Sequence, residues 1–125
     1  MKKEIVISIL IIIFIVIGDI LLEKYIENSF DLIENRLESI KSNLEDKEKS
    51  LLQMNEVNEE WDKRFNILTC FLEHDELEKI KTQLILIKSG IEVNDTEHSY
   101  EEIDKAIYIL EHLKEKQSLK LDNLF

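Results

Sequence analysis

The 125-residue sequence contains no proline and only two glycines, Gly18 and Gly90. Tight hairpin turns between β-strands depend on glycine, asparagine or proline at set positions, so a sheet of short strands is not expected. Leucine, isoleucine, glutamate and lysine dominate instead, which is typical of helical proteins. We therefore predict an all-α fold in a chain long enough for one small domain.

Cysteine is also scarce. Cys70 is the only one, so no disulfide can form within the chain and the fold must rest on packing. Because Cys70 lies in the apolar stretch NILTCFL, we expect it to be a small buried side chain. A disulfide to another molecule is the alternative.

Positive charge is in short supply, and the formal net charge is −11. The charged side chains of residues 1–22 cancel, so the whole excess falls in residues 23–125. An acidic domain repels phosphate groups. We therefore expect no nucleic-acid partner, and only poor direct binding to anionic lipid headgroups.

One long apolar run is present at residues 5–22, where only Ser8, Gly18 and Asp19 are not strongly apolar. As a helix it would be ~27 Å long, close to the ~30 Å hydrocarbon thickness of a bilayer. Its apolar side chains favour insertion by about 6 kcal/mol, whereas a centred aspartate would cost ~3 kcal/mol. The run is predicted to be an uncleaved transmembrane anchor; a cleaved signal peptide and a buried core helix are the alternatives.

Asp19 is tolerable because it lies near one end of the run, at the lipid–water boundary. There it is either a hydrated boundary residue or a polar contact to a membrane-protein partner. Lys2 and Lys3 precede the run and only Lys24 follows closely. The positive-inside rule then predicts that residues 1–4 are cytoplasmic and that residues 23–125 lie outside the cytoplasm, at the cell membrane.

Beyond the run, apolar residues recur at steps of three and four, which is typical of an amphipathic helix. This helix is expected to continue from the anchor without a break. The charged stretch 45–50 is expected to be a turn, and a second helix to cover about 49–72, with Trp61 as its largest core side chain. The apolar seam of the first helix comprises Ile26, Phe30, Ile33, Leu37, Ile40 and Leu44.

Two further helices are predicted from capping boxes, in which Asp75 pairs with Glu78 and Ser99 with Glu102. The third helix should end near Gly90, and the fourth should bury a seam that starts at Tyr100. Short loops make consecutive helices antiparallel, so residues 23–117 should form a bundle of about four helices. Residues 118–125 are expected to be an apolar tail that docks on it through Leu119, Leu121, Leu124 and Phe125.

Candidate chemistry is sparse. His74 and Glu78 stand four residues apart and could form half of a metal site, with His98 or His112 as further ligands. Helix capping by the acidic residues around His74 is the simpler interpretation. No motif of catalysis, phosphate binding or metal binding is recognisable, so we expect neither an enzyme nor a cofactor.

The chain resembles a family of bacterial single-pass membrane proteins known as domain of unknown function 4363. The resemblance rests on Lys2 and Lys3 before the apolar run, on Trp61, on the stretch FLEHDELEKI at 71–80 and on the ending LDNLF at 121–125. The family has no assigned activity. The resemblance implies an anchored helical domain and suggests a YetF-like membrane protein as a partner.

Three functional hypotheses follow. The first is a non-enzymatic accessory or interaction subunit of a cell-envelope membrane complex, with Asp19, Trp61, His74 and Glu78 as candidate partner contacts. The second is a scaffold that forms a coiled-coil homodimer through the seam of the first helix. The third is a ligand-binding or metal-binding domain built around His74, Glu78 and Trp61.

Overall fold

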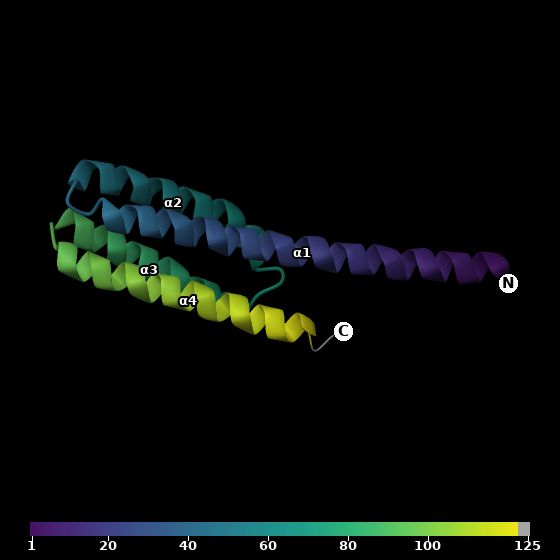
Figure 1. The fold of residues 1–125 in the computed structure, drawn as a ribbon. Coiled ribbons are helices and arrows are strands. Elements are labelled where there is room, and N and C mark those ends of the chain that lie inside the picture. The colour runs from purple at the N-terminus through teal and green to yellow at the C-terminus, as the bar shows by residue number, and fades with distance from the viewer. Residues whose placement is uncertain (123–125) are drawn as a thin grey trace.

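The computed structural model describes residues 1–122, with side chains up to residue 119. This part of the chain contains four helices and no strand, so the predicted all-α fold is confirmed. The helices are α1 (Lys2–Ser42), α2 (Lys47–Leu68), α3 (His74–Glu92) and α4 (Thr96–Asp122). They pack as a bundle from which one end of α1 projects (Figure 1).

The longest helix, α1, has 41 residues and is therefore about 60 Å long. Its first half projects from the bundle and all of its apolar side chains up to Ile17 are exposed. Among the described residues, α1 is the one helix long and apolar enough to cross a membrane. Its second half belongs to the bundle, so the predicted continuity between the apolar run and the first bundle helix is confirmed.

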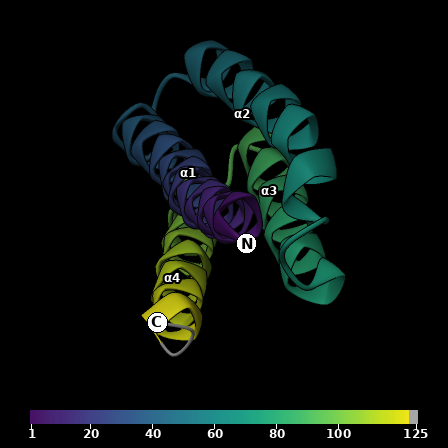
Figure 2. The ribbon, with the colours of Figure 1, turned by 90° about the vertical axis from the view of Figure 1, so that its right-hand side faces the viewer.

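The four helices form a closed ring in which each helix contacts the next one in sequence and α4 returns to contact α1. The two diagonal pairs make no close backbone contact within residues 1–122. Figure 2, a view along α1, shows this arrangement around a shared interior. Short connections make the helices alternate in direction, as expected.

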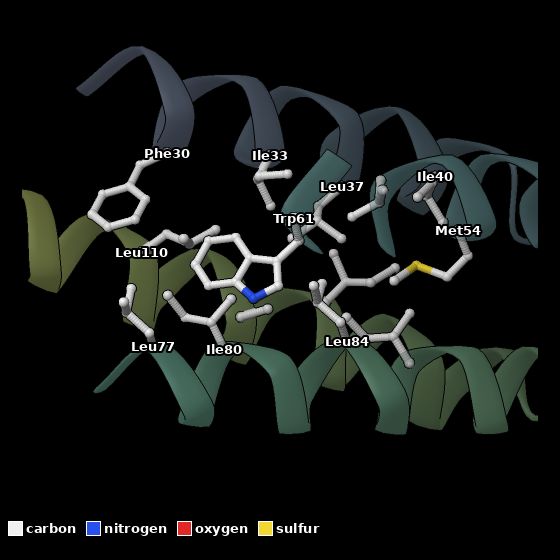
Figure 3. Packing of buried hydrophobic residues seen from close by; sticks show 14 of the residues in the cluster. Phe30, Ile33, Leu37, Ile40, Met54, Trp61, Leu77, Ile80, Leu84 and Leu110 are labelled. Carbon is white, nitrogen blue, oxygen red and sulfur yellow. The ribbon is translucent and has the colours of Figure 1, made fainter. Parts of the chain in front are cut away.

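The core is built around the seam of α1. All six predicted seam residues are buried, and the ring of Phe30 stacks on that of Trp61 with 6.4 Å between centroids. Trp61 has no exposed surface and lies between α1 and α3, close to Ile80 and Leu84 (Figure 3). The coiled-coil hypothesis needed this seam at the surface, but α2, α3 and α4 of the same chain cover it.

Both predicted capping boxes are wrong. α3 begins at His74 after Glu73, which makes no side-chain cap bond, and Asp75 lies in its first turn. α4 begins at Thr96, because the Asp95 carboxylate accepts a hydrogen bond from the backbone N–H of His98 at 3.0 Å. Each helix starts earlier than predicted because the chain has only a few residues in which to reverse. The Asp95 carboxylate caps the early start of α4, whereas no side chain caps the start of α3.

The turn between α3 and α4 depends on two residues. Gly90 does not end α3 but lies inside it, where an added Cβ would come within 2.6 Å of the Ser99 hydroxyl. Glycine therefore permits close contact between the two helices. The chain reverses through Asn94, which adopts a left-handed conformation with φ of 60°, as asparagine tolerates well.

Three burial predictions are also wrong. Cys70 is exposed, because α2 ends at Leu68 and the end of NILTCFL lies in the connection to α3. Tyr100 is 48% exposed and lies beside Lys41 rather than in the core. Leu119 is 63% exposed, since residues 118–122 continue α4 instead of folding back as a tail. The Leu121 side chain and residues Leu124 and Phe125 lie outside the part described.

Replacing Trp61 tests the core. Trp61→Ala should lower the free energy of unfolding by about 3–5 kcal/mol, because it leaves a large cavity between α1 and α3. Trp61→Phe should cost less, because it keeps a ring against Phe30 and removes an indole N–H with no partner among the described residues. The measurement is chemical denaturation of the full chain in detergent, followed by circular dichroism.

The control is Ile67→Ala on the same helix, at a side chain that is half exposed. This variant should change stability by under about 0.5 kcal/mol. Equal losses for Trp61→Ala and Ile67→Ala would contradict the described core.

Candidate functional site at the proximal end of the bundle

We call the end of the bundle from which α1 projects the proximal end. The start of the bundle half of α1, the α2–α3 connection at residues 69–73 and the last turns of α4 lie there (Figure 1). Two clusters of charged side chains join α1 to its neighbours near this end. The His74–Glu78 pair also lies there.

The first cluster joins α2 to α1. The Arg64 guanidinium donates to the Ser29 hydroxyl at 2.8 Å and to the Glu60 carboxylate at 3.0 Å. Ser29 is buried and donates in turn to the backbone carbonyl of Tyr25 at 2.7 Å. The guanidinium also lies 5.8 Å from the centroid of the Tyr25 ring, within the range of a cation–π contact. Arg64 thus fixes α2 against α1 just below the projecting half.

The second cluster joins α4 to α1. The Lys114 ammonium donates to Asp31 at 2.7 Å and to Glu34 at 3.2 Å. Burial lowers the pKa of Lys114, but the hydrogen bonds to Asp31 and Glu34 outweigh it and raise the pKa overall. Burial raises the pKa of Glu34 above its usual value, against the opposing effect of Lys114. One oxygen of Glu34 has no hydrogen-bond partner among the described residues.

A groove of about 300 Å³ lies beside this cluster, between α1 and α4. Carboxylates from Glu23, Glu27 and Glu115 line it together with Lys114. The excess of negative charge suits a cationic group, but Lys114 already neutralises part of it. The groove follows from the pairing of α1 with α4, and Gln117 and Ser118 of α4 also line it.

His74 and Glu78 do come together, with 3.2 Å between His74 Nε2 and a Glu78 oxygen. Both side chains are more than half exposed, and the His74 ring packs edge-on against Phe65 with 5.5 Å between centroids. His98 lies at the far end of the bundle, at the start of α4, and His112 stacks on Tyr108. Within the described residues no three histidine, cysteine or acidic side chains are placed to hold a metal ion.

The other two candidate contacts are separated from this pair. Asp19 lies on α1 above the bundle, where the helix begins to project. Trp61 is inside the core, so in this fold it presents no surface to a partner. The clusters around Arg64 and Lys114 were not predicted from the sequence. In each cluster the residues that belong to different helices lie tens of positions apart, and neither spacing nor composition indicates that they meet.

Comparison with known protein families identifies a family that matches most of the chain. A family described as a domain of unknown function (DUF4363) matches residues 20–124. The chain belongs to the DUF4363 family. No curated protein and no solved structure matches it.

In this DUF4363 protein the matched segment starts directly after Asp19 and contains the whole bundle. Most of the apolar run precedes the match. The Arg64 and Lys114 clusters and the His74–Glu78 pair all lie within it. The family domain is therefore the bundle, with the last turn of the apolar run at its edge.

The Lys114 cluster predicts a specific pH dependence. A raised folded-state pKa means that the protonated form of Glu34 is favoured on folding, so its contribution to stability is greatest at acidic pH and falls as pH rises through the folded pKa. Glu34→Gln removes this dependence. The free energy of unfolding of the Glu34→Gln variant, relative to that of the unsubstituted chain, should therefore increase between about pH 4 and pH 7. Chemical denaturation of both chains across that range measures it.

Glu45→Gln, at an exposed position, is the matched control and should show no such trend. Lys114→Met should destabilise the chain by about 1–2 kcal/mol at pH 7, because it leaves the Glu34 carboxylate partly buried without its cation. A flat difference for Glu34→Gln across the range would show that the burial of Glu34 has no energetic consequence.

Proposed function

We propose that this DUF4363 protein is a single-pass membrane protein and a non-enzymatic accessory subunit of a membrane complex. Residues 5–22 would cross the bilayer, residues 1–4 would lie in the cytoplasm, and the bundle would lie outside the cytoplasm. The subunit would act by holding its bundle against a membrane-protein partner. A YetF-like partner, suggested by the resemblance, belongs to the same proposal.

The observation that carries the proposal is the unbroken course of α1. Its first half exposes apolar side chains on every face, a surface that soluble monomers do not maintain in water. Its second half supplies the central seam of the core. Because no linker separates the two halves, the bundle has a fixed position and rotation relative to the segment that would lie in the bilayer.

The use of charge supports an interaction role rather than a catalytic one. Arg64 and Lys114 join helices of the chain at the proximal end, and Lys41 and Lys81 join helices elsewhere through Asp104 and Asp62. These groups stabilise the bundle. A rigid, acidic, helical body suits a protein that positions or contacts another one.

The exposed Cys70 tests the proposed orientation. A membrane-impermeant maleimide added to intact cells should label Cys70 without denaturant, because the thiol is exposed and would face the outside. Ser8→Cys in a Cys70→Ser background is the control, since its thiol would lie in the bilayer and should resist the reagent. Labelling of Cys70 only after cell lysis would contradict the orientation.

Recovery of the complex tests the accessory role. The full chain, tagged at its C-terminus and extracted from its native membrane in mild detergent, should retain a membrane-protein partner in near-stoichiometric amount. A control chain in which residues 5–22 are replaced by a plain leucine–alanine span separates contacts made by the bundle from those made by the anchor. Absence of a stoichiometric partner from both chains would exclude the accessory role.

A further inference from the structure

The apolar run contains two hydrogen-bonding side chains, Ser8 and Asp19, and they lie on one face of α1. Asp19 precedes Ile26 by about two helical turns and Ser8 precedes it by about five. At 3.6 residues per turn both therefore point within about 20° of the direction of Ile26. Ile12 and Ile15 lie between them on the same side, within about 40° of that direction.

The direction of this face is fixed by the bundle. Ile26 is buried in the core, and Leu22, one turn closer to Asp19, also packs against it. The face that carries Ser8 and Asp19 is thus a straight continuation of the seam that α2, α3 and α4 cover within the bundle. We call it the upper seam, defined by Ser8, Ile12, Ile15 and Asp19.

Within the described residues, no helix of this chain lies against the upper seam. Its apolar residues are about half exposed. The α2–α3 connection ends near the level at which α1 leaves the bundle (Figure 1). Ser8 is small and its hydroxyl donates to the backbone carbonyl of Glu4 at 2.9 Å, so it permits a close helix–helix approach, as small residues do in membranes. Asp19 brings acceptor oxygens that hydrocarbon cannot satisfy, so at the lipid–water boundary they take a donor from water or from a neighbouring helix.

A second copy of this chain does not fit the upper seam in parallel. Helices pack with their axes about 8–10 Å apart. The α1 helix of a second copy on this face would continue into the space on the core side of the first α1, which α2, α3 and α4 already occupy. Because α1 is continuous, the second helix cannot turn aside between its two halves. Figure 2 shows that the other three helices lie around this side of α1.

We infer that the upper seam binds a membrane-spanning helix of a different protein, which presents a hydrogen-bond donor or a cation to Asp19. That helix must end or turn near the level of Asp19, because the bundle fills the space beyond it. This inference rests on the proposed membrane location and specifies the partner contact. In this arrangement Asp19 contacts the partner helix, and the opposite side of α1 faces lipid.

Site-specific photo-crosslinking in the native membrane tests the face. A photoreactive phenylalanine analogue replaces Ile15 on the upper seam or Ile17 on the opposite face, two positions with similar depth and exposure. The Ile15 variant should crosslink to a transmembrane segment of another protein, identified by sequencing the joined peptides, and the Ile17 variant should not. A crosslink to a second copy of this chain, or equal crosslinks from both positions, would overturn the inference.

Moving the aspartate tests its role. Asp19→Leu should reduce recovery of the partner by about three- to fifteen-fold, the range of single polar contacts between membrane helices. Asp19→Leu combined with Leu21→Asp keeps the charge and nearly the same depth but turns the carboxylate about 160° from its original direction. This double variant should lose the partner equally, whereas Asp19→Asn should retain more of it through its amide oxygen.

The outcomes separate this inference from the proposed function. If the partner is retained at full level by both Asp19→Leu and the double variant, the accessory role stands and the inference about the upper seam is wrong. If the unsubstituted chain recovers no partner, the proposed function itself fails. Circular dichroism of each variant in detergent should show unchanged helix content, since position 19 lies outside the core.

Discussion

Burial of one face of α1 is the constraint on which the rest of the structure depends. Phe30 and its seam neighbours give α2, α3 and α4 a common surface, and Trp61 fills the space between α1 and α3. Because the same helix continues beyond the bundle, this packing also sets the direction of every side chain in the projecting half. A rotation of α1 within the bundle would expose the seam to water, so the core fixes which face of the apolar run points to the bundle interior.

Charge reinforces this arrangement at the proximal end. Arg64 from α2 and Lys114 from α4 approach α1 from two sides, close to the point where it leaves the bundle. Lys114 partly compensates for the burial of Glu34, whose raised pKa shows that desolvation still dominates at that carboxyl. With an excess of eleven negative charges, the bundle would be repelled by anionic headgroups. Under the proposed location, the continuous helix would hold it near the membrane despite that repulsion.

Much of the fold could be predicted because it depends on local spacing. The steps of three and four from Ile26 to Leu44 predicted a buried seam, and all six residues are buried. The capping boxes at Asp75 and Ser99 failed because a helix start depends on where the previous helix releases the chain as well as on nearby side chains. Cys70 failed for a related reason. Its apolar neighbours suggested burial, yet α2 ends two residues earlier and leaves the thiol at the surface.

The candidate site was less accessible to prediction. From the sequence alone, the pairing of His74 with Glu78 and the position of Asp19 near the end of the apolar run could be deduced, because both follow from spacing along one helix. The contact of Lys114 with Asp31 and Glu34 joins residues about eighty positions apart, and no local pattern encodes it. The sequence by itself determined which segments are helical and which face of each is apolar, since these properties repeat every 3.6 residues. Only the tertiary structure decided that the seam is covered within one chain, because that depends on how distant helices meet.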